Sequence, residues 1–213
     1  TFVGGHQYDD AGSFRMMALG HDWVMGGGQA RPEAQYQSVA TPVDGRTGPY
    51  QLGRVIWDEI VTEAGETAAV GSIFAMDLRK ASGCYAERYV AVDYTGACGA
   101  PVLLAILDQI DDHQSRNWAW NLTFEPGLAL KRHAGNEGFT LRASDGSSLV
   151  AHFLGATPEA IALRRTPETQ RYFQFGHPQP YPGRPYLCAT FPAQEHLSIY
   201  VIATVHREAP PDV

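Results

Sequence analysis

The residues best suited to chemistry lie close to the start of the chain. His6, Tyr8 and Asp10 occupy every second position of the segment GGHQYDDAGSF, which spans residues 4–14. Because side chains alternate along an extended strand, the three would point to the same side if this segment is extended. An imidazole, a phenol and a carboxylate on one surface can exchange protons at neutral pH. The segment is therefore a candidate acid–base site.

The three side chains carry different expectations. We expect His6 to be catalytic or to contact substrate, and the alternative is a structural histidine in a glycine-rich loop. Tyr8 offers a hydroxyl that could contact a substrate or bond to a neighbouring group. Asp10 is expected to be structural, because an Asp just before Gly12 and Ser13 commonly accepts backbone N–H bonds and fixes a loop.

The charge of the chain restricts the class of partner. The 213 residues carry 16 basic and 23 acidic side chains, a formal net charge of −7, which argues against non-specific nucleic-acid binding. An acidic glycan could still bind where arginines gather, since guanidinium groups bind carboxylate and sulfate in a bidentate manner. For each arginine the alternative is a solvated or ion-paired surface residue. Five arginines are candidates, of which the first and fourth are preferred as substrate contacts: Arg31, Arg46, Arg54, Arg88 and Arg116.

Neither a membrane span nor a cysteine-based site is expected. No apolar run approaches the length of about 20 residues that a transmembrane helix needs. The spacing of Cys84, Cys98 and Cys188 fits no metal-binding pattern, and free cysteines are the preferred interpretation. A bridge between Cys84 and Cys98 is the alternative.

An alternation of period two dominates the chain and predicts an all-β fold. Many short strands separated by turn signals favour a large antiparallel β-sandwich, which we expect to form a single domain over residues 1–213. Residues 58–69 are rich in Glu and Ala, but Gly65 favours strand–turn–strand over helix. Trp118 and Trp120 share one strand face and are expected in the core, as are Trp23 and Trp57; a sugar-stacking platform is the alternative for the first pair. The expected strands are 13–19, 23–26, 52–61, 68–77, 85–94, 102–110, 118–124, 138–143, 148–154, 160–164, 186–191 and 197–205.

The first segment also resembles a family signature. Residues 6–14, HQYDDAGSF, are similar to the H-x-H-x-D-x-x-S-F pattern that opens the C-terminal β-domain of heparinase II/III-like polysaccharide lyases. The later segments at 87–94, 102–110 and 118–122 agree with that family in outline. The resemblance implies a supersandwich-like β-domain that follows an α/α-toroid domain, with the substrate cleft between them. The chain would then lack its N-terminal strands and the toroid.

The resemblance also implies a reaction. These lyases cut uronate-containing polysaccharides by β-elimination, in which a base removes the proton alpha to the uronate carboxyl and an acid protonates the leaving oxygen. His6 matches the histidine that the β-domain contributes, and the other groups belong to the toroid. The chain alone would therefore be inactive, its partners would be the toroid and an acidic polysaccharide, and its location would be periplasmic or secreted.

The sequence departs from the family at its zinc site. The family builds that site from the second His of H-x-H, the Asp of a D-x-G turn and a later His. Tyr8, Gly26 and Gln35 stand in these places here, and none offers a typical zinc ligand. We therefore expect no metal and no other cofactor.

Two alternatives to a lyase follow from the residues. The departure at the zinc site favours a non-catalytic sandwich that binds carbohydrate or has a structural role. A hydrolase with Thr1 as an N-terminal nucleophile, its α-amino group acting as the base, is the other alternative. The small number of expected helices disfavours the hydrolase.

Overall fold

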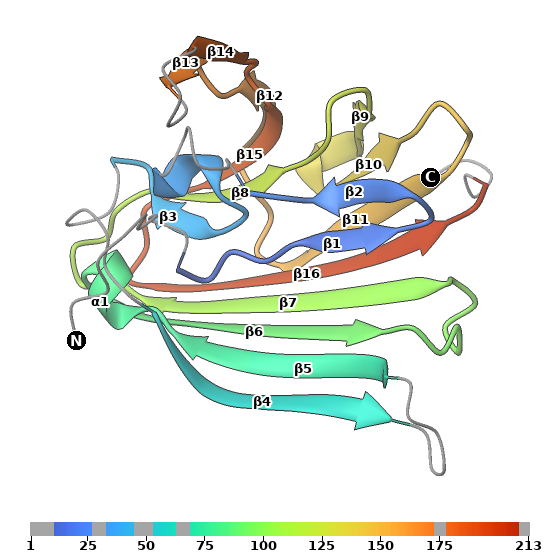
Figure 1. Cartoon of the computed structure of the whole chain (residues 1–213). Helices are drawn as coiled ribbons and strands as arrows, with labels where there is room; N and C mark the ends of the chain where they lie inside the picture. The colour runs from blue at the N-terminus through green and yellow to red at the C-terminus, as the bar shows by residue number, and fades with distance from the viewer. Residues whose placement is uncertain (1–10, 27–32, 45–52, 63–68, 173–177, 209–213) are drawn as a thin grey trace.

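Two antiparallel sheets packed face to face form the protein (Figure 1), in a computed structural model that describes residues 11–26, 33–44, 53–62, 69–172 and 178–208. The large sheet has eight strands in the order β4 (Arg54–Thr62), β5 (Ala69–Asp77), β6 (Tyr85–Asp93), β7 (Val102–Asp111), β16 (His196–His206), β11 (Ser148–Gly155), β10 (Gly138–Arg142) and β9 (Ala129–Arg132). The small sheet has the order β12 (Ala160–Arg165), β15 (Pro185–Phe191), β8 (Trp118–Thr123) and β3 (Ala40–Pro42). The predicted β-sandwich is confirmed.

Strands β7 and β16 show why the alternating sequence folds in this way. They pair in an unbroken register from His196 opposite Asp111 to Val205 opposite Val102. Every second side chain of β7 is buried, and from Leu197 onward the same holds for β16. One face of each strand therefore enters the space between the sheets, where burial of apolar surface stabilises the sandwich.

Large aromatic side chains fill that space. Trp23, Trp118 and Trp120 are at most 1% exposed, and the ring of Trp120 meets the ring of Phe153 edge-to-face at 5.6 Å. Trp118 and Trp120 are therefore core residues, as preferred, and cannot form a sugar-stacking surface. The prediction for Trp57 is wrong: this side chain is 47% exposed on the edge strand β4.

The long strands agree with the sequence-based prediction better than the short elements do. Residues 58–69 end β4 at Thr62 and begin β5 at Ala69, which confirms two strands there. The helix α1 (Arg79–Ser82) was not expected, and no helix within the described ranges is long and apolar enough to cross a membrane. The strands that the sequence did not predict are β3, β9, β13 (Thr169–Tyr172) and β14 (Pro178–Tyr181).

The N-terminal part of the described chain forms a hairpin over the sandwich. Strands β1 (Met16–Ala18) and β2 (His21–Val24) pair with each other and not with either large layer. Met25 adds a single bridge to Thr123 of β8. The hairpin therefore covers the core from the side of the small sheet (Figure 1). Trp23 of β2 is fully buried and belongs to the core.

The three cysteines are free thiols, so the alternative bridge between Cys84 and Cys98 does not form. Cys188 is buried in β15, and Cys84 is partly buried. Burial raises the pKa of Cys84 to about 11, which keeps its thiol protonated at neutral pH.

Candidate functional site

Several of the predicted site residues lie outside the described part of the chain. These are His6, Tyr8, Asp10 and Arg31, as well as Thr1. Their roles stay predictions. The described chain starts at Ala11, so the site has to be built from the groups that hold the end of the motif and from the surface beside it.

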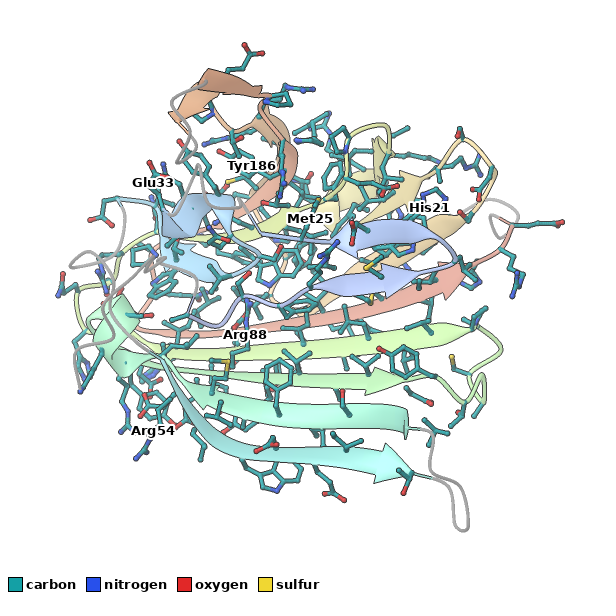
Figure 2. All side chains as sticks on the ribbon, in the orientation of Figure 1. His21, Met25, Glu33, Arg54, Arg88 and Tyr186 are labelled. Carbon is teal, nitrogen blue, oxygen red and sulfur yellow. The ribbon has the colours of Figure 1, made fainter. Side chains whose placement is uncertain are left out.

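Arg88 lies inside the protein and not at a substrate surface (Figure 2). Its side chain is 0% exposed, and it faces Asp108 across the pair of strands β6 and β7. The Nε and Nη2 atoms donate to the two carboxylate oxygens of Asp108 at 2.6 and 2.7 Å, a bidentate ion pair. The predicted substrate contact of Arg88 is therefore corrected, because its guanidinium is enclosed and neutralised within the core.

The remaining nitrogen of Arg88 holds the end of the motif. Its Nη1 donates to the carbonyl oxygens of Gly12 at 2.9 Å and Ser38 at 2.7 Å. The hydroxyl of Ser13 in turn accepts a hydrogen bond from the backbone N–H of Ser38 at 3.2 Å. The charged donor thereby fixes two segments against the large sheet, and Gly12 follows Asp10 by two positions in the sequence.

Gly12 is required by this close approach. Its φ of +84° is unfavourable for any residue with a Cβ, and a Cβ there would lie 2.9 Å from the Cδ1 atom of Leu78. The glycine of the signature thus has a structural explanation, as does the serine that follows it. Both act in positioning the segment.

An open cavity of about 460 Å³ lies beside Ala11. Its lining comes from the start of β4, the end of β5 and α1, namely Gly53, Arg54, Asp77, Arg79 and Lys80. A Cβ placed on Gly53 would lie 3.3 Å from the Cβ of Ala11, so the cavity adjoins the point where the motif joins the sandwich. Figure 2 shows Arg54 at the end of the large sheet where α1 lies.

Positive charge predominates in this cavity. Asp77 accepts hydrogen bonds from Nε and Nη2 of Arg79 at 2.9 and 2.6 Å, and Nη2 of Arg54 lies 3.8 Å from the same carboxylate. The hydrogen bonds from Arg79 lower the pKa of Asp77 to about 2. Lys80 makes no ion pair or hydrogen bond with any described residue. Arg79 and Arg54 thus lie against one carboxylate, and Lys80 adds a third cation to the lining of the cavity.

A second polar cluster, centred on His21, was not found from the sequence. The Nδ1 atom of His21 lies 2.6 Å from Oε1 of Glu125, and its Nε2 atom lies 3.1 Å from Oδ2 of Asp145. Hydrogen bonding to Glu125 first, and then to Asp145, raises the pKa of His21. Both ring nitrogens are engaged, so this histidine fastens β2 to two loops instead of offering a free base.

The His21 cluster gave no local signal in the sequence. Its two carboxylate partners are 104 and 124 positions away from the histidine. Figure 2 places His21 at the end of the sandwich opposite Arg54, so this cluster and the basic cavity are separate features.

Two of the three positions that hold zinc ligands in the resembled family can be inspected. Gly26 offers only its carbonyl, which accepts a hydrogen bond from Nη1 of Arg184 at 2.9 Å, and Gln35 is an exposed residue of a 3₁₀ turn. Across the described ranges, no group of three or more His, Cys, Asp or Glu side chains is placed to hold a metal ion. Tyr8 lies outside those ranges, and the loss of the family's zinc site stays a prediction.

Comparison with known proteins gives a likeness of fold. Neither a family model nor a curated protein matches the sequence. Among solved structures, heparan sulfate lyase HepC from Pedobacter heparinus superposes with a TM-score of 0.63 at 13% identity, over 96% of this chain and 32% of that one. Heparinase III superposes with a TM-score of 0.61 at 9% identity, over 95% of this chain and 30% of that one.

A mutant of HepC gives a similar result, with a TM-score of 0.64 at 12% identity over 96% of this chain. The chain spans about a third of the length of these lyases. At such identities the comparison shows a shared fold, and the sandwich is of the kind found in heparinase-type lyases.

Proposed function

We propose that this chain is the β-domain of a polysaccharide lyase that cleaves an acidic, uronate-containing glycan by β-elimination. It works with an N-terminal α/α-toroid domain in the periplasm or outside the cell. The observation that carries the proposal is the likeness to heparan sulfate lyases over nearly the whole chain, together with the HQYDDAGSF segment at its start.

His6 is the proton-transfer group in this proposal. A uronate proton leaves readily only if the negative charge that develops is stabilised and a base is positioned beside it. An imidazole can serve at neutral pH, and Tyr8 and Arg31 contact the substrate while Asp10 orders the loop. The hydrogen bonds of Arg88 to Gly12 and Ser38 support the assignment, because they fix the sheet end of the segment.

The proposal assigns no zinc to the domain. The support is the chemistry of the residues that replace the family's ligands: a glycine at 26, a glutamine at 35 and a phenol at 8. The second candidate function, a non-catalytic carbohydrate-binding or structural sandwich, is favoured by the same three replacements. The hydrolase alternative needs layered helices, and the described part of the chain has a single α-helix of four residues.

A lyase assay tests the proposal, including the catalytic role of His6. The protein, with any N-terminal part of its natural polypeptide, is incubated with alginate, heparin, heparan sulfate, chondroitin, hyaluronan and ulvan. The ultraviolet absorbance of the unsaturated uronate is followed. We expect product from at least one polymer and a loss of roughly 100-fold or more in turnover for His6→Ala, the usual contribution of general acid–base catalysis.

His113→Ala is the matched control for this assay. His113 is an exposed histidine on the loop after β7, and the substitution should leave turnover unchanged. Unchanged turnover in a folded His6→Ala variant would remove His6 from the mechanism. Binding of a polymer without any product would favour the non-catalytic sandwich.

A further inference from the structure

We propose that the cavity beside Ala11 binds an anionic substituent of the glycan, a sulfate ester or a carboxylate, through Arg79, Lys80 and Arg54. The proposal rests on the proposed function in one respect, that the ligand is an acidic glycan. The cavity is a feature of the described surface, and its binding can be measured whether or not the protein is catalytic.

Local charge is the first argument. The chain as a whole is acidic, with a net charge of −7, so its average field repels a polyanion. The cavity reverses that sign, since its lining holds three cations, from β4 and α1, and one carboxylate, Asp77. The carboxylate of Glu87 also acts on Arg79 from nearby, and the positive charge still exceeds the negative charge. An anionic group that approaches this end of the sandwich is therefore attracted to the cavity rather than to the surface in general.

The orientation of Arg79 is the second argument. Nε and Nη2 lie along one edge of the planar guanidinium, and both donate hydrogen bonds to Asp77. These two bonds hold the guanidinium in place. Nη1 donates to no described residue, so it and the second hydrogen of Nη2 form a free edge. Such a free edge matches two oxygens of a sulfate or carboxylate in a bidentate manner. The hydrogen bonds from Arg79 lower the pKa of Asp77 to about 2, so its carboxylate is ionised and holds the guanidinium at neutral pH.

Lys80 supplies the third argument. Its ammonium group has three donors and makes no bond within the described ranges, so binding an anion breaks no existing ion pair. Arg54, at 3.8 Å from Asp77, is 73% exposed and can turn toward a ligand. The volume of about 460 Å³ falls in the range of roughly 300–1,000 Å³ typical of small-ligand pockets, enough for a substituted sugar unit.

The position of the cavity connects it to the candidate catalytic residue. Gly53 of the cavity wall lies next to Ala11, the first described residue of the motif, since a Cβ added to Gly53 would lie 3.3 Å from the Cβ of Ala11. Five Cα–Cα steps separate Ala11 from His6 along the chain, a span of at most about 18 Å when fully extended. His6 is therefore tied by the chain to within about 18 Å of Ala11, the described residue next to the cavity wall.

Titration with defined oligosaccharides tests the proposal. Isothermal titration is run with a heparin oligosaccharide, which has sulfates and carboxylates, with a heparosan oligosaccharide, which has carboxylates alone, and with neutral maltohexaose. We expect the unchanged protein to bind the anionic ligands and not maltohexaose. The double variant Arg79→Ala/Lys80→Ala should weaken anion binding by about tenfold or more, since two charged hydrogen-bond donors are lost.

Arg142→Ala is the matched control. Arg142 is an exposed arginine on β10, which five strands of the large sheet separate from β4, and its loss removes a positive charge without touching the cavity. It should change affinity less than about twofold. A loss in the double variant for heparin alone identifies a sulfate site, and a loss for both anionic ligands identifies a carboxylate site.

The outcomes separate this proposal from the lyase assignment. Absent binding of both anionic ligands by the unchanged protein overturns the cavity assignment, as does equal weakening by Arg142→Ala and the double variant. Lyase activity with an unaltered KM in the double variant also overturns it and leaves the lyase standing. Specific anion binding without any lyase product would support the cavity proposal and contradict the lyase proposal. The charge-conserving Arg79→Lys and the uncharged, near-isosteric Lys80→Met, checked by circular dichroism, exclude unfolding as the cause of lost binding.

Discussion

At the scale of single residues, the burial of Arg88 could be predicted from the alternating pattern, but its ion pair with Asp108 could not. Ala86, Arg88 and Val90 share one face of β6, and all three are buried. On β7, Asp108 lies on the buried face between Ile106 and Ile110. The sequence therefore held a signal for two inward-facing opposite charges. Their pairing could not be found from it, because the register that sets them opposite each other is a property of the sheet.

Removing one member of the buried pair should destabilise the protein strongly. Arg88→Ala leaves the Asp108 carboxylate enclosed without its partner and frees the carbonyls of Gly12 and Ser38. We expect a loss of about 3–5 kcal/mol in the free energy of unfolding. Urea denaturation followed by tryptophan fluorescence measures it, with Arg142→Ala as a surface control expected within about 0.5 kcal/mol.

A companion variant shows whether charge burial is the cause. Arg88→Met/Asp108→Leu replaces both charges by apolar side chains and should recover much of the lost stability, because no buried charge is left unpaired. A loss below about 1 kcal/mol for Arg88→Ala would contradict the enclosed ion pair. The double variant keeps no donor for Gly12, so its turnover would report how far the anchor positions the motif.

At the scale of elements, the sequence predicted the long strands and missed the pieces that depend on a partner. Strand β3 has three residues, includes Pro42, and is a strand because Ala40 and Thr41 lie opposite Trp120 and Ala119 of β8. So short a segment has no measurable periodicity. The basic cavity was also missed, because it depends on how separate elements are arranged. Arg54 was a candidate on its own, but its closeness to Arg79 and Lys80 follows from the β4–β5 register and the turn into α1.

His21 fastens the β1–β2 hairpin to both layers of the sandwich. Glu125 follows β8 of the small sheet, and Asp145 lies in the turn between β10 and β11 of the large sheet. The raised pKa of His21 means that folding favours the protonated ring. This contribution is fully present below the unfolded pKa of about 6.5 and is lost as the pH rises through the higher folded value.

Thermal melting against pH tests this contact. His21→Gln should lower the melting temperature by about 2–4 °C at pH 5.5, as expected for a loss of about 1 kcal/mol in the free energy of unfolding. This difference in melting temperature between the variant and the unchanged protein, the gap, should be smaller at pH 9. The range stays above pH 5 so that Asp145 does not contribute to the pH dependence. Its pKa is lowered to about 2, chiefly by hydrogen bonds from Ser147, and its contribution is fully present above the unfolded pKa of about 3.8. His113→Gln is the control, and a gap that does not change with pH would exclude the charged contact.

At the scale of the whole molecule, the class of fold was predictable and the order of strands was not. Alternation identifies which residues face a core, but it does not determine which strands pair with each other. For example, β16, the last strand of the chain, lies between β7 and β11. The two sheets are unequal, and the strands on the β4 side of the large sheet extend beyond the four-stranded layer (Figure 1). Every residue of β4 is exposed.

The exposed edge at β4 should make the isolated chain associate with itself. Five large apolar side chains of this strand are 43–69% exposed: Val55, Ile56, Trp57, Ile60 and Val61. Edge backbone groups can pair with another chain, and the register irregularities at Val55/Trp57 and Val61/Thr62 leave the middle of the strand regular. Sedimentation velocity should therefore show oligomers that increase with concentration.

A lysine on the edge strand should suppress this association. Ile60 is the most exposed apolar residue of β4, at 69%, and Ile60→Lys places a charge where a second strand would pair. Leu154→Lys is the matched control, since Leu154 is 49% exposed on β11, a strand with a neighbour on each side. Ile60→Lys should stay monomeric to concentrations at least about tenfold higher than the unchanged chain, equivalent to about 1.4 kcal/mol of association energy. An equal effect of both variants would assign the association to apolar surface in general, and the open edge of β4 would then have no special part in it.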